Sequence, residues 1–198
     1  MITEDTAMHS KEEQIHPVFY STVDKIPFTH CLVCERNLLQ EPDVPYMIEK
    51  NIRRYEHLGT EQPVFEFAIC QPCQMEMSEA LSTESRERMQ TYFQENMNTS
   101  QLIRLQYEDA TIEERLAYCL LSGEPIAEQS EYSIYALCRG DIMEVSIFPF
   151  ALSGKVLDEM ASLLSAKSLG EMDDFMGNYF SGPPELREIL KTRPTLLV

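Results

Sequence analysis

The sequence contains no long apolar run. The longest one, from Val145 to Leu152, includes Ser146 and Pro149, and it is much shorter than the ~20 apolar residues that a membrane-spanning helix needs. The first 14 residues are polar and lack the apolar stretch of a secretory signal. We therefore expect a protein that stays in the cytosol and has no membrane partner.

Positive charge is also scarce. The chain has 16 lysines and arginines against 33 aspartates and glutamates, a net charge of -17. A field of this sign repels phosphate backbones, so it disfavours general nucleic-acid binding, and it suits a basic protein partner. Many cytosolic proteins are simply acidic, however. One compact basic cluster, formed by Lys50, Arg53 and Arg54, keeps nucleic-acid binding as a third hypothesis.

No arrangement of residues typical of a nucleophilic enzyme is present. There are only four histidines, all in the first third of the chain and none near a recognisable nucleophile motif. We therefore predict no catalytic residue and no bound organic cofactor, and we expect a protein that is not an enzyme.

Six cysteines are present, and four of them form two C-x-x-C pairs. A reducing cytosol disfavours disulfides, so the pairs indicate metal or redox chemistry. Zinc takes four ligands in tetrahedral geometry, and two C-x-x-C turns supply four thiolates. The sequence predicts one structural Zn²⁺ held by Cys31, Cys34, Cys70 and Cys73. The other two, Cys119 and Cys138, are expected to be small buried apolar residues.

The order of elements around these pairs resembles the treble-clef and zinc-ribbon-like groups of zinc-binding domains. The first pair lies in a loop, a strand pair follows, and the second pair opens a helix; the resemblance covers about residues 28–82. It implies a zinc scaffold with four cysteine ligands and no particular activity, because such scaffolds serve unrelated functions. One departure is Glu35, which stands where glycine often follows the first pair and provides a positive φ.

A rival interpretation uses the second pair alone. Strand, C-x-P-C and helix follow one another as in a thioredoxin-type site, in which Cys70 would be the nucleophile and Cys73 the resolving thiol. The chain has no tryptophan, which such sites usually contain beside the motif. Pro125 and Pro149 both fit poorly as the cis-proline that faces such a site. The redox interpretation also leaves the first C-x-x-C pair without a role.

The predicted fold class is α+β, with a small treble-clef-like zinc domain followed by a helix, a β-hairpin and further helices. We expect residues 1–27 to be disordered or loosely packed, residues 28–98 to form the zinc-binding domain with its following helices, and residues 105–198 to form an α+β C-terminal domain.

Within these parts, hydrophobic periodicity, turn residues and helix caps predict the individual elements. The expected strands and the loop between them are Tyr46–Tyr55 (which also fits a helix), 57–63 (loop), Val64–Ile69, Tyr132–Cys138 and Ile142–Phe148. The expected helices are Gln74–Leu81, one capped by Ser82 or Thr83, one from Thr111 to Gly123, one from Ser153, one capped by Ser168, and a short one after Pro184.

Together these patterns predict a zinc-binding protein of the cytosol that acts as a non-enzymatic protein-binding or adaptor module, with its partner met through the C-terminal half. The alternative is a thiol–disulfide oxidoreductase that uses Cys70 and Cys73.

Overall fold

The computed structural model describes residues 11–97 and 110–180. Six antiparallel strands form one sheet, in the order β1-β5-β4-β2-β3, with β6 also pairing with β4. The strands are β1 (Lys11–Gln14), β2 (Tyr46–Tyr55), β3 (Thr60–Cys70), β4 (Glu131–Arg139), β5 (Ile142–Val145) and β6 (Phe150–Ser153). The helices are α1 (Gln71–Ala80), α2 (Thr83–Asn96), α4 (Ile112–Leu116), α5 (Gly154–Ser162) and α6 (Ala166–Tyr179).

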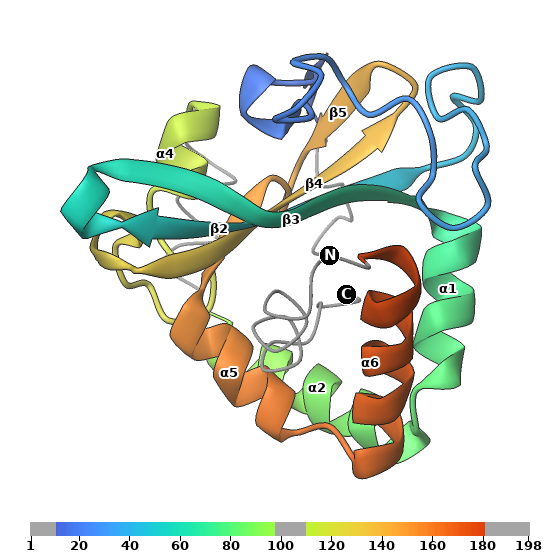
Figure 1. Ribbon diagram of the computed structural model, residues 1–198, viewed down its shortest axis with the longest axis vertical. Coiled ribbons are helices and arrows are strands. Elements are labelled where there is room, and N and C mark those ends of the chain that lie inside the picture. The colour runs from blue at the N-terminus through green and yellow to red at the C-terminus, as the bar shows by residue number, and fades with distance from the viewer. Residues whose placement is uncertain (1–10, 98–109, 181–198) are drawn as a thin grey trace, which may run out of the picture.

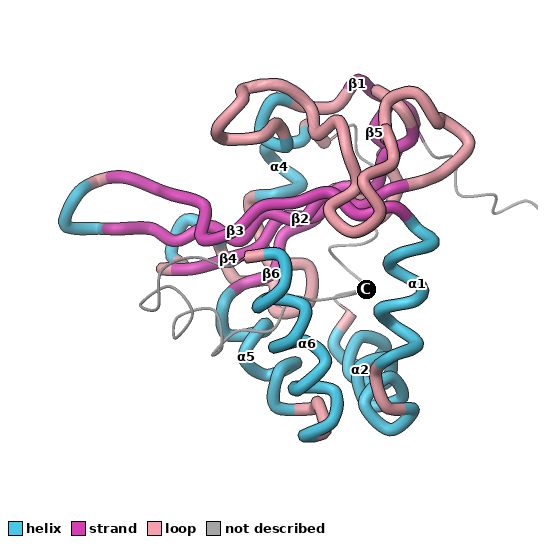
Figure 2. Tube along the Cα trace, turned by 45° about the vertical axis from the view of Figure 1, so that its right-hand side comes forward, coloured by secondary structure: helices cyan, strands magenta, loops and turns pink. Residues whose placement is uncertain are grey.

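The sheet separates two layers. Helices α1, α2, α5 and α6 lie on one face, and the N-terminal segment with the loop that precedes β2 lies on the other (Figures 1 and 2). On the helical face, Phe67 of β3 contacts Phe175 of α6 with ring centroids 6.1 Å apart. On the opposite face, the Lys50 ammonium of β2 donates to the carbonyls of Val18 and Tyr20. Both faces of β2 are therefore covered, and its first six residues are buried.

One sheet runs through both predicted parts of the chain. Strand β2 pairs with β3 on one side and with β4 on the other, the latter from Tyr46↔Cys138 to Arg53↔Glu131. The α+β class is confirmed. The division into two domains stays a prediction, and because β2 and β4 share a long ladder we expect the two parts to unfold together.

The N-terminal segment differs from the prediction. Residues 1–10 lie outside the described residues, but Lys11–Gln14 form β1, which pairs with β5. Ile15 and Phe19 are 3% and 0% exposed, so residues 11–20 are neither disordered nor loosely packed. Sequence reasoning missed this because the acidic, polar residues pair through the backbone, and two isolated apolar residues supply the burial.

Several element boundaries also differ. Strand β3 begins at Thr60, so most of the predicted loop at 57–63 belongs to it. Strand β6 was not predicted, and the Phe148–Pro149 peptide bond before it is cis. Helix α6 begins three residues earlier than predicted, with Ser165 as its cap. A linker is expected over residues 96–106, of which Asn96 belongs to α2 and residues 98–106 lie outside the described residues. The helix expected after Pro184 also lies outside them.

The helix predicted from Thr111 to Gly123 ends at Leu116, although its capping box is present. The chain then turns so that Leu120 donates its amide to the carbonyl of Ala151 on β6, at 2.8 Å. Cys119 and Leu120 are buried against that strand. Tertiary packing therefore overrides the helical periodicity of this segment.

Four serines join the first turns of α2 and α6. Ser82 and Ser165 cap these helices, and the amide of Ser82 donates to the Ser168 hydroxyl at 2.9 Å. In return, the amide of Ser165 donates to the Ser85 hydroxyl, also at 2.9 Å. Each helix thus completes the cap of the other, which fixes α2 against α6.

Among the described residues, no helix is long and apolar enough to cross a membrane.

Candidate metal centre

The four paired cysteines come from two segments that the fold brings together. Cys31 and Cys34 lie in the turn that precedes β2. Cys70 is the last residue of β3 and the N-cap of α1, and Cys73 lies in the first turn of that helix. The amide of Leu32 donates to the Ala68 carbonyl of β3 at 2.9 Å. This backbone bond holds the first pair beside the second.

The sulfur atoms of Cys31, Cys34, Cys70 and Cys73 all lie within 4.8 Å of one another. The Cys34 and Cys70 sulfurs are 3.7 Å apart. Four thiolates around one zinc ion at ~2.3 Å have sulfurs separated by ~3.8 Å, from tetrahedral geometry. The four cysteines therefore form a group that fits a single metal ion, as the sequence predicts.

Three of the four sulfurs belong to buried residues, and Cys34 alone is exposed. The backbone amide of Cys70 donates to the Cys31 sulfur at 3.4 Å. Amide donors of this kind stabilise thiolates, and burial excludes water from the site. A tetrahedral shell has four positions, and these four cysteines would fill all of them.

The cysteine pKa values differ within the group. Partial desolvation beside the neighbouring sulfurs raises the pKa of the exposed Cys34, but hydrogen bonds from the Arg36 amide and from the other three thiols outweigh it and lower that pKa to about 7. Burial is the main cause that raises the pKa of Cys70 and of Cys73. The Arg36 guanidinium also pairs with Cys34, which raises the pKa of the arginine. Sequence reasoning missed Arg36, whose spacing from the first pair is its only indication.

The first cysteine turn has a left-handed residue directly after its second cysteine, although that residue is a glutamate. Glu35 has φ +58°, a left-handed conformation that favours glycine. Its amide donates to the Cys31 carbonyl at 3.0 Å, and the Arg36 carbonyl accepts from the Cys31 amide at 3.0 Å. Glutamate instead of glycine at position 35 therefore adds backbone strain to the turn but leaves its hydrogen bonds intact.

Replacing Glu35 by glycine is expected to stabilise the protein by ~1 kcal/mol, because glycine adopts this φ without a Cβ clash. Urea unfolding of the metal-loaded protein measures the gain. Gln40→Gly is the matched control, since Gln40 is exposed on the same loop and has no positive φ. That control should lose stability, and an equal loss in both variants would contradict the account.

Among the described residues, the remaining candidate ligands stay apart from this group. His30 is exposed and its ring nitrogen Nδ1 bonds to the Thr29 hydroxyl at 2.9 Å. Cys119 and Cys138 are both 0% exposed, which confirms that they are small buried residues. Burial raises the pKa of Cys138 to about 12.

All three residues of the basic cluster form ion pairs. Lys50 pairs with Glu66 at 3.0 Å, and Arg53 pairs with Glu131 at 2.6 Å. Arg54 pairs with Glu61 in the same way. These side chains stabilise β2 within the sheet, so they are not a free patch for a phosphate backbone.

No protein-family model, no curated protein and no solved structure matches this chain. Within the described residues, four cysteines on two segments could hold one metal ion.

Proposed function

We propose that Cys31, Cys34, Cys70 and Cys73 hold one Zn²⁺ ion and that this ion is structural. The main support is the distance of at most 4.8 Å among the four sulfurs, which suits the tetrahedral thiolate sites that zinc prefers. The ion would fasten the loop before β2 to the end of β3 and the start of α1. Without the ion, four thiols of different pKa lie against one another, and three of them belong to buried residues.

We further propose that the protein is a non-enzymatic protein-binding module. A shell of four cysteines leaves no open position for catalysis, so the metal would serve the fold. The net charge of -17 favours a basic protein partner and disfavours nucleic acid. A pull-down with a panel of basic and acidic proteins at low and at 0.5 M salt tests this: we expect salt-sensitive capture of basic partners only.

The dithiol alternative finds less support. It requires Cys70 to be a reactive nucleophile, yet Cys70 is 0% exposed and burial raises its pKa. Reactive thiols are accessible and have lowered pKa values. The accessible cysteine with the lowered pKa is Cys34, which the alternative leaves unused.

Elemental mass spectrometry of protein purified without chelator tests the metal proposal. We expect one zinc per chain. Alkylation at pH 6–7 provides an independent test, since metal-bound thiolates should react only after a chelator is added. Rapid alkylation of Cys70 in metal-free, folded protein would support the dithiol alternative instead.

Zinc affinity is expected to fall as the pH falls. The metal binds thiolates, whereas Cys70 and Cys73 have raised pKa values in the metal-free protein, so binding releases at least two protons near pH 7. Affinity should then drop at least ~100-fold per pH unit between pH 8 and 6. Competition with a zinc-binding dye at each pH measures the slope, and Cys138→Ala should leave it unchanged. A flat profile would contradict thiolate ligation.

A further inference from the structure

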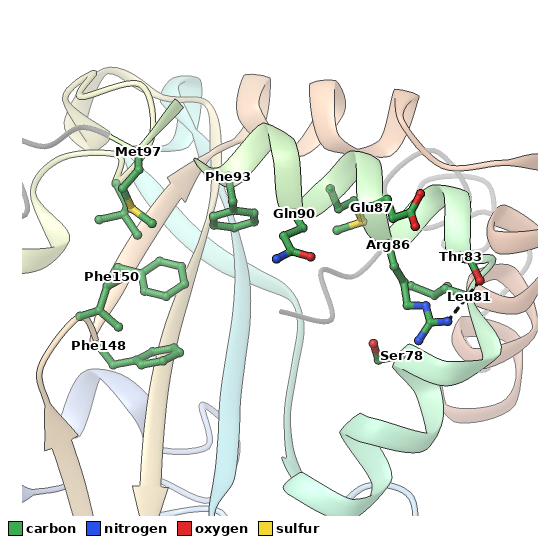
Figure 3. A pocket seen from close by; sticks show the side chains of 13 residues that line it. Ser78, Leu81, Thr83, Arg86, Glu87, Gln90, Phe93, Met97, Phe148 and Phe150 are labelled. Atoms are coloured by element: carbon green, nitrogen blue, oxygen red, sulfur yellow. Dashed lines mark hydrogen bonds between the residues drawn. The ribbon is translucent and has the colours of Figure 1, made fainter. Parts of the chain in front are cut away.

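A second site lies away from the cysteines, between α2 and the segment that leads into β6. It is a pocket of about 640 Å³, within the range of roughly 300–1,000 Å³ that is usual for small-molecule sites. Figure 3 shows that the side chains of α2 line one wall, and that Phe148 and Phe150 line another. Phe93 of α2 and Met97, the C-cap of that helix, are only partly buried and line this pocket.

The two ends of the pocket differ in chemistry. Phe93, Met97, Phe148 and Phe150 gather at one end (Figure 3), where Phe148 and Phe150 contact each other with ring centroids 5.0 Å apart. Aromatic rings and methionine adapt their packing to a flexible apolar chain. This end therefore suits an alkyl group and offers it no polar partner.

The other end holds Arg86. Its guanidinium points from α2 toward Ser78 of α1 and lies 3.5 Å from the Thr83 hydroxyl, whereas the Glu87 carboxylate points away from it (Figure 3). No ion pair of Arg86 is found within residues 11–97 and 110–180, although acidic residues outnumber basic ones two to one. An arginine without a carboxylate partner, beside an apolar pocket, is an anion-binding group.

We propose that this pocket binds a small amphipathic carboxylate, such as a medium-chain fatty acid. The alkyl chain lies among Phe93, Phe148 and Phe150, and the carboxylate accepts hydrogen bonds from Arg86. The proposal is independent of the metal site.

Isothermal titration of the full chain with decanoate and with decan-1-ol in 0.15 M salt tests this. Decanoate should bind at one per chain, about tenfold more tightly than the alcohol, because a charge-assisted hydrogen bond contributes that much at a partly exposed site. Arg86→Met should weaken decanoate about tenfold and leave the alcohol unchanged. Arg88→Met is the matched control: Arg88 lies on the same helix, pairs with Glu84 at 2.6 Å, and should change neither affinity.

A second variant fills the pocket without removing core packing. Gln90 is exposed and its side chain enters the pocket between Arg86 and Phe93 (Figure 3), so Gln90→Trp should abolish binding of both ligands in a folded protein. Equal affinities of wild type and Arg86→Met for decanoate would overturn the proposal, as would the absence of saturable binding. A dimer in light scattering that decanoate does not dissociate would assign the pocket to a second copy and overturn it too.

Discussion

Cys70→Ser is expected to lose the metal and to unfold the protein at 25 °C. Cys70 closes β3, caps α1 and lies 3.7 Å from the Cys34 sulfur, so its loss opens the metal shell at its most buried point. Structural zinc contributes roughly 10–16 kcal/mol of binding free energy in small domains, which exceeds the ~5–15 kcal/mol that separates folded from unfolded proteins. Circular dichroism and elemental analysis of the purified variant measure both effects.

The matched control is Cys138→Ala. Cys138 is equally buried and is the register partner of Tyr46 on the neighbouring strand, but it lies outside the sulfur group. This variant should keep one zinc per chain and lose only ~1 kcal/mol through a small cavity. If Cys70→Ser and Cys138→Ala unfolded at the same urea concentration, the cysteines of the group would be ordinary core residues and the structural role of the metal would be wrong.

Lys50→Met is expected to destabilise the protein by ~3 kcal/mol. The side chains of Lys50 and Glu66 are only 8% and 13% exposed, and removing one partner of a buried pair leaves the other charge uncompensated. Glu66 also accepts from the Thr22 amide at 2.6 Å and from its hydroxyl at 2.7 Å. The pair therefore holds the N-terminal segment on the sheet. Urea unfolding at pH 7 measures the loss.

A double-mutant cycle separates the pair from its surroundings. The double variant Lys50→Met with Glu66→Gln should lose less unfolding free energy than the sum of the two single variants, because the second change removes the uncompensated carboxylate. Arg88→Met breaks the exposed pair with Glu84, whose side chains are 53% and 62% exposed, and should cost at most ~0.5 kcal/mol. If Lys50→Met left stability unchanged but reduced retention on immobilised RNA, the basic cluster would be a binding surface after all.

The cysteine group could be predicted from the sequence because local chemistry defines it. A C-x-x-C turn is so short that it brings its two sulfurs together independently of the rest of the fold. The strand-like run before the second pair and the helix formers after it predict that this pair lies at the start of a helix. The bounds of β2 agree with the predicted strand, although that segment also fitted a helix, and the start of α2 agrees with a cap at Ser82, one of the two capping residues predicted.

The rest depends on contacts between distant residues. Strand β6 is four residues long and is held by pairing with β4 and by a hydrogen bond from Leu120. Its own sequence therefore contains no local signal that predicts it. Phe93 has the spacing of a core residue, and only the position of Phe148 shows that a pocket remains beside it. The ion pairs of Lys50 and Arg53 join residues 16 and 78 positions apart. The sequence therefore shows a basic cluster but not the carboxylates that neutralise it.

X-ray absorption at the zinc edge of the purified protein tests the central claim most directly. We predict four sulfur neighbours at ~2.3 Å and no nitrogen or oxygen in the first shell. Three sulfurs with one nitrogen would assign a histidine to the shell in place of one cysteine, and a protein that folds with no zinc at all would contradict the structural metal centre.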